Sequence, residues 1–253
     1  MICAIVIAAI GFGTSPRSVS AASSKLSTFS DGKPSCPVTI YVDGQKDKTC
    51  YVNFWVTGFQ EKAKGRKNPF VVKQDGKIVA WSVKVGKPTK AMRKAGAAAY
   101  GTTGQGGHPA VRLAVLAKVP NKKNTYRLAR QSPIAKLHKH YGTQPVFTLG
   151  KPLTVKKGQI VALSVWTWSP TMTNYNYTRN SAWRASANNN NGNCKKAGRQ
   201  GYKVSPQKKV NSKRQYACKF NDLLLYSAQI VPKASTSAAD VEPVTLSSIP
   251  EDE

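Results

Sequence analysis

Short runs of apolar residues, each about the length of one β-strand, recur along the chain and constrain its fold more than any other feature. In residues 159–168, for example, Val161, Leu163 and Val165 alternate with residues that would face the opposite way. Gly, Pro, Asn and Lys separate the runs, as is typical of strands joined by turns. We expect strands in seven runs: residues 49–56, 76–85, 111–119, 125–132, 159–168, 182–187 and 222–231.

This pattern predicts an all-β fold, specifically a jelly-roll-like antiparallel β-sandwich with long basic loops. Within 76–85 the alternation places Val79, Trp81, Val83 and Val85 on one apolar face. Helical spacing is kept only over 90–101, which we expect to form a short helix or a loop.

The two ends of the chain differ in composition from the middle. Residues 2–13 are almost all apolar and lead into the small-residue sequence "VSAA", so we expect a signal peptide over residues 1–22, although no Lys or Arg precedes the apolar run. Residues 233–253 hold five of the eleven acids, and we expect a disordered acidic tail that folds back on the basic body. Residues 23–232 then form a single domain without a transmembrane segment, and the protein is secreted, either extracellular or in the cell envelope.

Cysteine usage agrees with export. Beyond Cys3, inside the expected signal peptide, the chain holds Cys36, Cys50, Cys194 and Cys218. An even number of cysteines in an exported chain indicates disulfides; proximity in sequence favours Cys36–Cys50 and Cys194–Cys218, although three pairings are possible. A zinc site is disfavoured because the chain has no C-x-x-C pair and no histidine close to a cysteine.

Positive charge dominates the chain, with 39 Lys and Arg residues against 11 Asp and Glu residues and a net charge of +28. Residues 194–218 are the densest part, with eight basic residues and no acid, and residues 58–69 are also basic. Such a segment binds polyanions through many weak, salt-sensitive contacts, or it only keeps the protein soluble. The candidate polyanion-binding residues are Lys195, Lys196, Arg199, Lys208, Lys209, Lys213 and Arg214.

Aromatic residues gather in residues 165–186. Exposed rings there would stack on sugars or bases, whereas a Trp at a strand end also commonly closes the rim of a sandwich core. The candidate aromatic platform consists of Trp166, Trp168, Tyr175 and Tyr177.

Catalytic and metal-binding patterns are sparse. Glycoside hydrolysis needs two paired carboxylates, yet the body holds six acids, and Asp43, Asp47 and Asp75 lie in turn-like sequence. His138 and His140 would share one face of an extended segment, but the sequence supplies no third ligand. We therefore expect no catalytic residue, no metal and no cofactor. A hydrolase remains an alternative if Asp222 or Glu61 converges with His138 or His140 in a cleft.

One resemblance bears on the fold. The ordered segments "DGKIVAWSVKVG", "RLAVLAKV", "YRLARQSP", "PLTVKKGQIVALSVWTWSP", "WRAS" and "LLLYSA", with a late cysteine pair, resemble secreted bacterial β-sandwich proteins of unknown function. The resemblance covers roughly residues 50–230. It implies the sandwich fold and an exported location, and it carries no activity and no catalytic residue to this chain.

Together these features predict a secreted, non-catalytic β-sandwich that binds an anionic or carbohydrate extracellular surface, such as a cell-wall polymer or polysaccharide. Nucleic acid is a further partner through non-specific charge. The alternatives are a secreted hydrolase acting on polysaccharide or nucleic acid, and a purely structural extracellular protein. The oligomeric state stays open.

Overall fold

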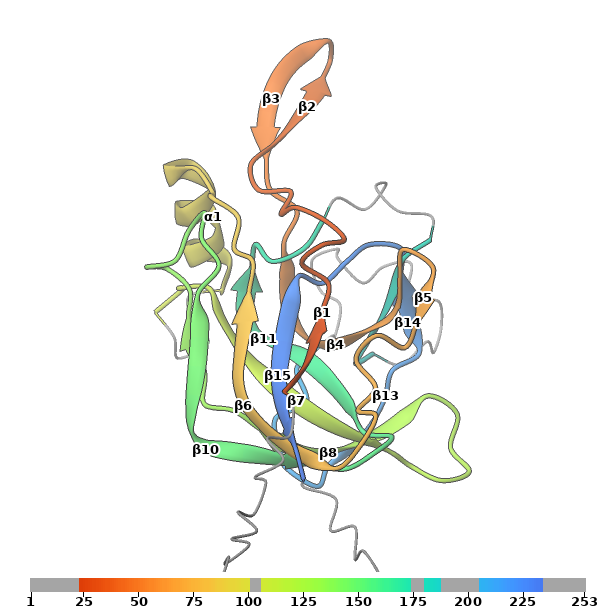
Figure 1. Cartoon of the computed structure of the whole chain (residues 1–253). Coiled ribbons are helices and arrows are strands. Elements are labelled where there is room, and N and C mark those ends of the chain that lie inside the picture. The colour runs from red at the N-terminus through yellow and green to blue at the C-terminus, as the bar shows by residue number, and fades with distance from the viewer. Residues whose placement is uncertain (1–22, 101–105, 174–179, 188–204, 234–253) are drawn as a thin grey trace, which may run out of the picture.

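Antiparallel strand pairing organises the chain into two main sheets and a separate hairpin (Figure 1). The computed structural model describes residues 23–100, 106–173, 180–187 and 205–233. A four-stranded sheet has the order β1 (Ser24–Ser27), β15 (Tyr226–Pro232), β6 (Gly76–Val83) and β10 (Val146–Val155). The fold is all-β and sandwich-like, as predicted.

The larger sheet is curled and contains nine strands. Its main path runs β13 (Lys213–Gln215), β8 (Thr125–Gln131), β7 (Ala110–Lys118), β11 (Ile160–Ser169), β4 (Asn53–Ala63), β12 (Ala182–Ala185) and β14 (Cys218–Phe220). Two short strands lie off this path: β5 (Arg66–Lys67) pairs with β4, and β9 (Ala135–Lys136) pairs with β7. Several neighbouring strands, such as β4 and β11 or β12 and β4, therefore come from distant parts of the sequence.

The main core lies between the two sheets and follows the predicted alternation in β11. Val161, Leu163 and Val165 are all buried in one cluster with Leu113 of β7 and Ile230 of β15. Burying such branched side chains stabilises a fold by about 1.5–3 kcal/mol each. The inward face of β11, at least, can be predicted from sequence alone.

The predicted core-facing side of β6 is wrong at one residue, Val79. The register between β6 and β15 shifts between Ala80 and Ile78, so one residue of β6 is left over as a bulge. Ile78 is buried in the core beside Trp81 and Val83, and Val79 is not part of that cluster. A bulge reverses the alternation on one side of itself, and the sequence shows no signal for it.

Two features extend beyond the sandwich. The hairpin of β2 (Val38–Val42) and β3 (Gln45–Thr49) projects from one end in Figure 1. The Cys36–Cys50 disulfide ties the base of this hairpin, as the cysteine spacing predicted. Helix α1 (Lys90–Tyr100) confirms the helical alternative for residues 90–101. It begins after Thr89, whose hydroxyl oxygen accepts a hydrogen bond from the N–H of Met92.

Candidate functional site

Two tryptophans are brought together on the face of the nine-stranded sheet opposite to the core. Trp55 of β4 lies opposite a shift in the β4–β11 register, where Val165 pairs with Val56 but Trp168 pairs with Phe54. The φ angle of Trp55 is 46°, a left-handed conformation that costs a non-glycine residue energy. This irregular backbone re-aims the Trp55 side chain toward Trp166 of β11, and Lys208 lies over both rings.

Arg112 of β7 contacts Trp166 from the neighbouring strand. Its strand partner is Ser164, two residues from Trp166, so that both side chains project from the same face. The guanidinium lies 4.2 Å from the centre of the Trp166 ring. Only 8% of the residue is exposed. Burial lowers the pKa of Arg112 to about 10, so the side chain still carries its positive charge at neutral pH.

Within the described part of the chain, no acid balances this buried charge. The ion pairs found among the described residues involve Arg66, Arg184 and Lys219, and none involves Arg112. The Nε atom of Arg112 is buried without a hydrogen-bond partner among the described residues. A buried cation without a counter-charge is costly, which makes Arg112 a natural partner for an anion supplied from outside.

Lys208 adds a second cation above the tryptophans. Its Nζ atom lies 4.4 Å from the centre of the Trp55 ring and 4.9 Å from that of Trp166. Lys208 is exposed, so its ammonium group is accessible to solvent. We call Trp55, Arg112, Trp166 and Lys208 the Arg112 cluster.

Gln207 fixes the segment that carries Lys208. Its backbone N–H donates to the hydroxyl of Thr57 at 2.9 Å, and its side-chain amide donates to the carbonyl of Ser212 at 2.6 Å. The buried Tyr216 hydroxyl donates to Gln207 Oε1 at 2.8 Å. Thr57 in turn shares a hydrogen bond of 2.8 Å with Ser164 of β11. Lys208 is thus held over the rings by a buried polar network.

The other predicted polyanion-binding residues are not part of the Arg112 cluster. Lys209 and Lys213 are exposed near Lys208 in the sequence, and Arg214 donates to the Ser205 hydroxyl at 2.7 Å. Lys195, Lys196 and Arg199 lie outside the described residues. Residues 213–215 form β13 at the edge of the large sheet, so this part of the basic segment is a strand and not one of the long basic loops that we expected.

The four residues of the predicted aromatic platform do not lie at one site. Trp166 belongs to the Arg112 cluster, whereas Trp168 is only 2% exposed. The indole N–H of Trp168 donates to the carbonyl of Gly107, and its ring lies against Gly96 of α1, where a side chain would not fit. Trp168 therefore closes the core rim. Tyr175 and Tyr177 lie outside the described residues.

A second charged group lies on the same face of the sheet. Glu61 of β4 accepts a hydrogen bond from Arg184 of β12 at 2.6 Å and pairs with Lys219 of β14 at 3.0 Å. Burial alone would raise the pKa of Glu61, but hydrogen bonds and charge from Lys219 and Arg184 hold that pKa below its ordinary value. We call these residues the Glu61 triad.

The acids and histidines of the hydrolase alternative do not converge. The backbone carbonyl of Asp222 accepts a hydrogen bond from the side chain of Gln60, which points to the opposite face of β4 from that of Glu61. His138 follows β9, which pairs with β7 at the Ala110 end, and its ring stacks on His108 at 4.2 Å. Burial, His108 and nearby lysines lower the pKa of His138, and no acid contributes. His140 packs edge-on against Phe147.

Further predictions concern metal binding, membrane spans and disulfides. Within the described part of the chain, no cluster of three or more His, Cys, Asp or Glu side chains is arranged to hold a metal ion. The same residues include no helix with the length and apolar character needed to cross a membrane. Cys218 takes part in a disulfide, and its predicted partner Cys194 lies outside the described residues. The expected signal peptide and acidic tail also lie outside them, apart from Lys233.

Sequence reasoning missed Trp55, Arg112 and Gln207. One signal was present for Arg112, because it interrupts the otherwise apolar start of the run 111–119 on the side away from the core. Trp55 and Gln207 gave no comparable signal, since their roles depend on a bulge and on a long-range contact.

Comparisons with known proteins add no assignment to this geometry. No family model matches the chain, and no curated protein or solved structure matches it either. The resemblance to secreted bacterial β-sandwich proteins therefore stays a prediction.

Proposed function

We propose that this protein is a secreted, non-catalytic β-sandwich that binds an acidic extracellular polysaccharide through the Arg112 cluster. The observation that carries the proposal is the buried guanidinium of Arg112, which lies over Trp166 without an acid among the described residues, while exposed Lys208 lies over both Trp166 and Trp55. A carboxylate or sulfate of the polymer would supply the missing counter-charge, with a charge-assisted hydrogen bond worth about 1.5–3 kcal/mol.

The two indole rings favour a ligand that also contains rings. Planar aromatic faces stack on sugars or bases, and the ring-bound cations Arg112 and Lys208 would orient the anionic group of the ligand between them. Exposed Lys209 and Lys213 would add weaker, salt-sensitive attraction along the polymer.

The extracellular setting rests on separate support. The Cys36–Cys50 disulfide is of a kind that persists in oxidising compartments. The apolar start of the sequence resembles a signal peptide. An acidic polysaccharide is then a more available partner than a cytoplasmic nucleic acid.

Retention of the protein on immobilised polygalacturonate, measured across a salt gradient, tests the proposal. We expect Arg112→Met to weaken binding about tenfold, because about 1.4 kcal/mol of ion pairing is lost. Arg130→Met is the matched control, since Arg130 is exposed on β8 and its loss changes the net charge equally. It should change binding by less than about twofold.

Other outcomes would overturn the proposal in distinct ways. Equal losses for the two arginine variants would assign binding to overall charge. Retention on neutral dextran that survives high salt would assign it to the tryptophans alone. Tighter binding to single-stranded DNA than to polygalacturonate at the same salt concentration would assign the cluster to nucleic acid.

A further inference from the structure

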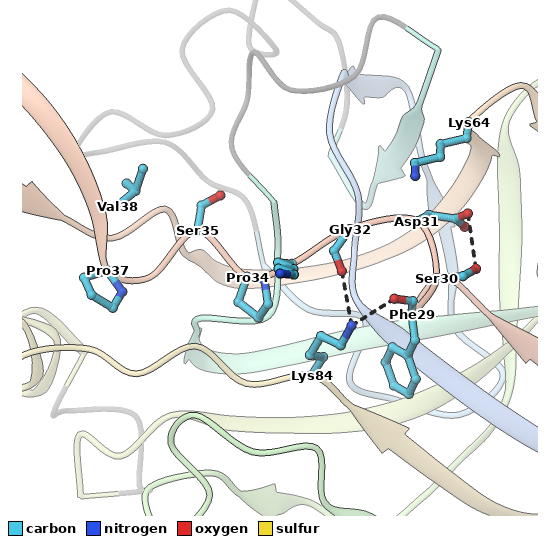
Figure 2. A pocket seen from close by; sticks show the side chains of 11 residues that line it. Phe29, Ser30, Asp31, Gly32, Pro34, Ser35, Pro37, Val38, Lys64 and Lys84 are labelled. Atoms are coloured by element: carbon cyan, nitrogen blue, oxygen red, sulfur yellow. Dashed lines mark hydrogen bonds between the residues drawn. The ribbon is translucent and has the colours of Figure 1, made fainter.

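A cavity that shares no residue with the Arg112 cluster lies beside the segment that joins β1 to the hairpin (Figure 2). Its volume is about 460 Å³, within the range of sites that hold small ligands. Lys84 approaches it from the end of β6 and Lys64 from the turn after β4. The lining residues are Phe29, Ser30, Asp31, Gly32, Lys33, Pro34, Ser35, Pro37, Val38, Lys64 and Lys84. We call this hollow the Lys84 cavity.

The wall of the Lys84 cavity is anchored along its length. The Thr28 hydroxyl donates to the Leu224 carbonyl at 2.6 Å. The backbone N–H of Ser35 donates to the carbonyl of Met172 at 3.0 Å, and the backbone N–H of Lys87 donates to the carbonyl of Cys36 at 2.6 Å. The disulfide between Cys36 and Cys50 closes the far end. A cavity whose wall is fixed in this way loses little conformational freedom when it binds a ligand.

The charge of the lining is positive. Among the described lining residues, Asp31 supplies the one carboxylate, and that carboxylate already pairs with Arg66, which is not part of the lining. Three lysines remain: Lys33, Lys64 and Lys84. The Lys84 ammonium donates to the carbonyls of Phe29 at 2.9 Å and Gly32 at 3.3 Å. These acceptors are neutral, so they fix the position of the ammonium without cancelling its charge.

Apolar surface lies next to these cations. Phe29, Pro34, Pro37 and Val38 contribute to the lining, and the Lys84 ammonium lies 5.7 Å from the centre of the Phe29 ring. The cavity thus combines a place for a ring with fixed positive charge.

We infer that the Lys84 cavity binds a small organic oxyanion with a ring body, namely a sugar unit that carries a carboxylate or a sulfate. The ring lies against Phe29 and the prolines, and the oxyanion faces Lys64 and Lys84. This inference is independent of the proposed polymer binding, because it uses none of the residues of the Arg112 cluster.

Calorimetric titration of the full chain with glucuronate, glucose 6-sulfate and glucose tests the inference. We expect at least one of the two anions to bind in the millimolar range, about −4 kcal/mol, and glucose to bind at least tenfold more weakly. Preference for glucuronate identifies a carboxylate ligand, and preference for glucose 6-sulfate identifies a sulfate ligand. No heat from either anion up to about 10 mM, or equal binding of glucose, overturns the inference.

Two variants locate the site. Lys64→Met removes a cavity cation from an exposed turn and should weaken anion binding at least threefold. The matched control is Lys67→Met, because Lys67 is exposed on neighbouring β5 but does not line the cavity. Equal effects of the two variants would overturn the assignment to this cavity. Arg112→Met should leave binding of the small anion unchanged, so failure here and failure of the proposed function are separable.

Discussion

The Glu61 triad and the Arg112 cluster lie on the same face of one sheet, but only the triad pairs its cations with an acid. Arg184 meets a carboxylate at 2.6 Å, whereas Arg112 lies over the ring of Trp166, which Lys208 also faces, and pairs with no acid among the described residues. The charges of Glu61, Arg184 and Lys219 neutralise one another, so the triad has a structural role. The cluster keeps a free positive charge in a partly dry site, which is an arrangement suited to a ligand.

The difference also separates the contributions of the two regions to stability. Removing one partner of a compensated pair leaves an orphan charge and destabilises the fold. Removing a charge that has no partner relieves a desolvation cost. Three predictions test this contrast, in order of decreasing effect.

Asp222 shows how a buried carboxyl group without an ion-pair partner among the described residues responds to pH. Burial raises its pKa to about 7, although the Trp183 side chain opposes the shift. The folded protein therefore retains a proton that the unfolded chain loses above about pH 4. The contribution of Asp222 to stability is therefore greatest below about pH 4, falls by up to about 4 kcal/mol as the pH rises to about 7, and then levels off.

Asp222→Asn should remove this decline. In urea unfolding, the variant should match the wild type near pH 4 and exceed it at pH 8. Asp43→Asn, at the exposed hairpin turn, is the control and should leave the pH dependence unchanged. The same pH slope in Asp222→Asn and the wild type would show that burial does not govern this carboxyl group.

Glu61→Gln breaks the compensated region. We expect a loss of about 1–3 kcal/mol in the free energy of unfolding at pH 7, because Arg184 and Lys219 lose their counter-charge. The pKa of Glu61 lies below its ordinary value, so the stability it contributes is present at neutral pH and lost as the pH falls through that folded pKa. The difference between variant and wild type should shrink in acid. A constant difference across pH would exclude the ion pairs as its cause.

Arg112→Met and Arg184→Met compare the two arginines directly. We expect Arg112→Met to leave stability unchanged or to raise it by about 1 kcal/mol, since methionine fills the site without a buried charge. Arg184→Met should lower stability, because Glu61 loses its hydrogen-bonded partner and keeps only the exposed Lys219 as a counter-charge. Thermal melts of both variants provide the measurement. Equal destabilisation would mean that Arg112 is a structural residue, and the contrast between the regions would fail.

The sequence predicted much of the fold through local patterns. Alternation in residues 159–168 identified the buried face of β11, and the cysteine spacing identified Cys36–Cys50. The alternation missed β10, because most of that strand is exposed and its register shifts between Thr148 and Leu153, around Gly150 and Pro152. It also missed the projecting hairpin, whose strands bury little apolar surface.

The candidate site was only partly predictable, for a physical reason. Trp166 and Lys208 were candidates because of residue type and local density. Their contact, together with Trp55, depends on a strand bulge and on the Gln207 hydrogen bond to Thr57. Neither feature has a local signature, because both result from packing between segments far apart in the chain.

The sequence by itself determined the all-β class, the buried face of β11 and the excess of positive charge. Only the tertiary structure decided which cations are balanced. Glu61 and Arg184 are 123 residues apart and meet because β4 and β12 pair in one register. The β4–β11–β7 register instead places Arg112 beside aromatic rings. Composition counts charges, but strand register sets the distances between them, and those distances decide whether a charge is neutralised or left for a ligand.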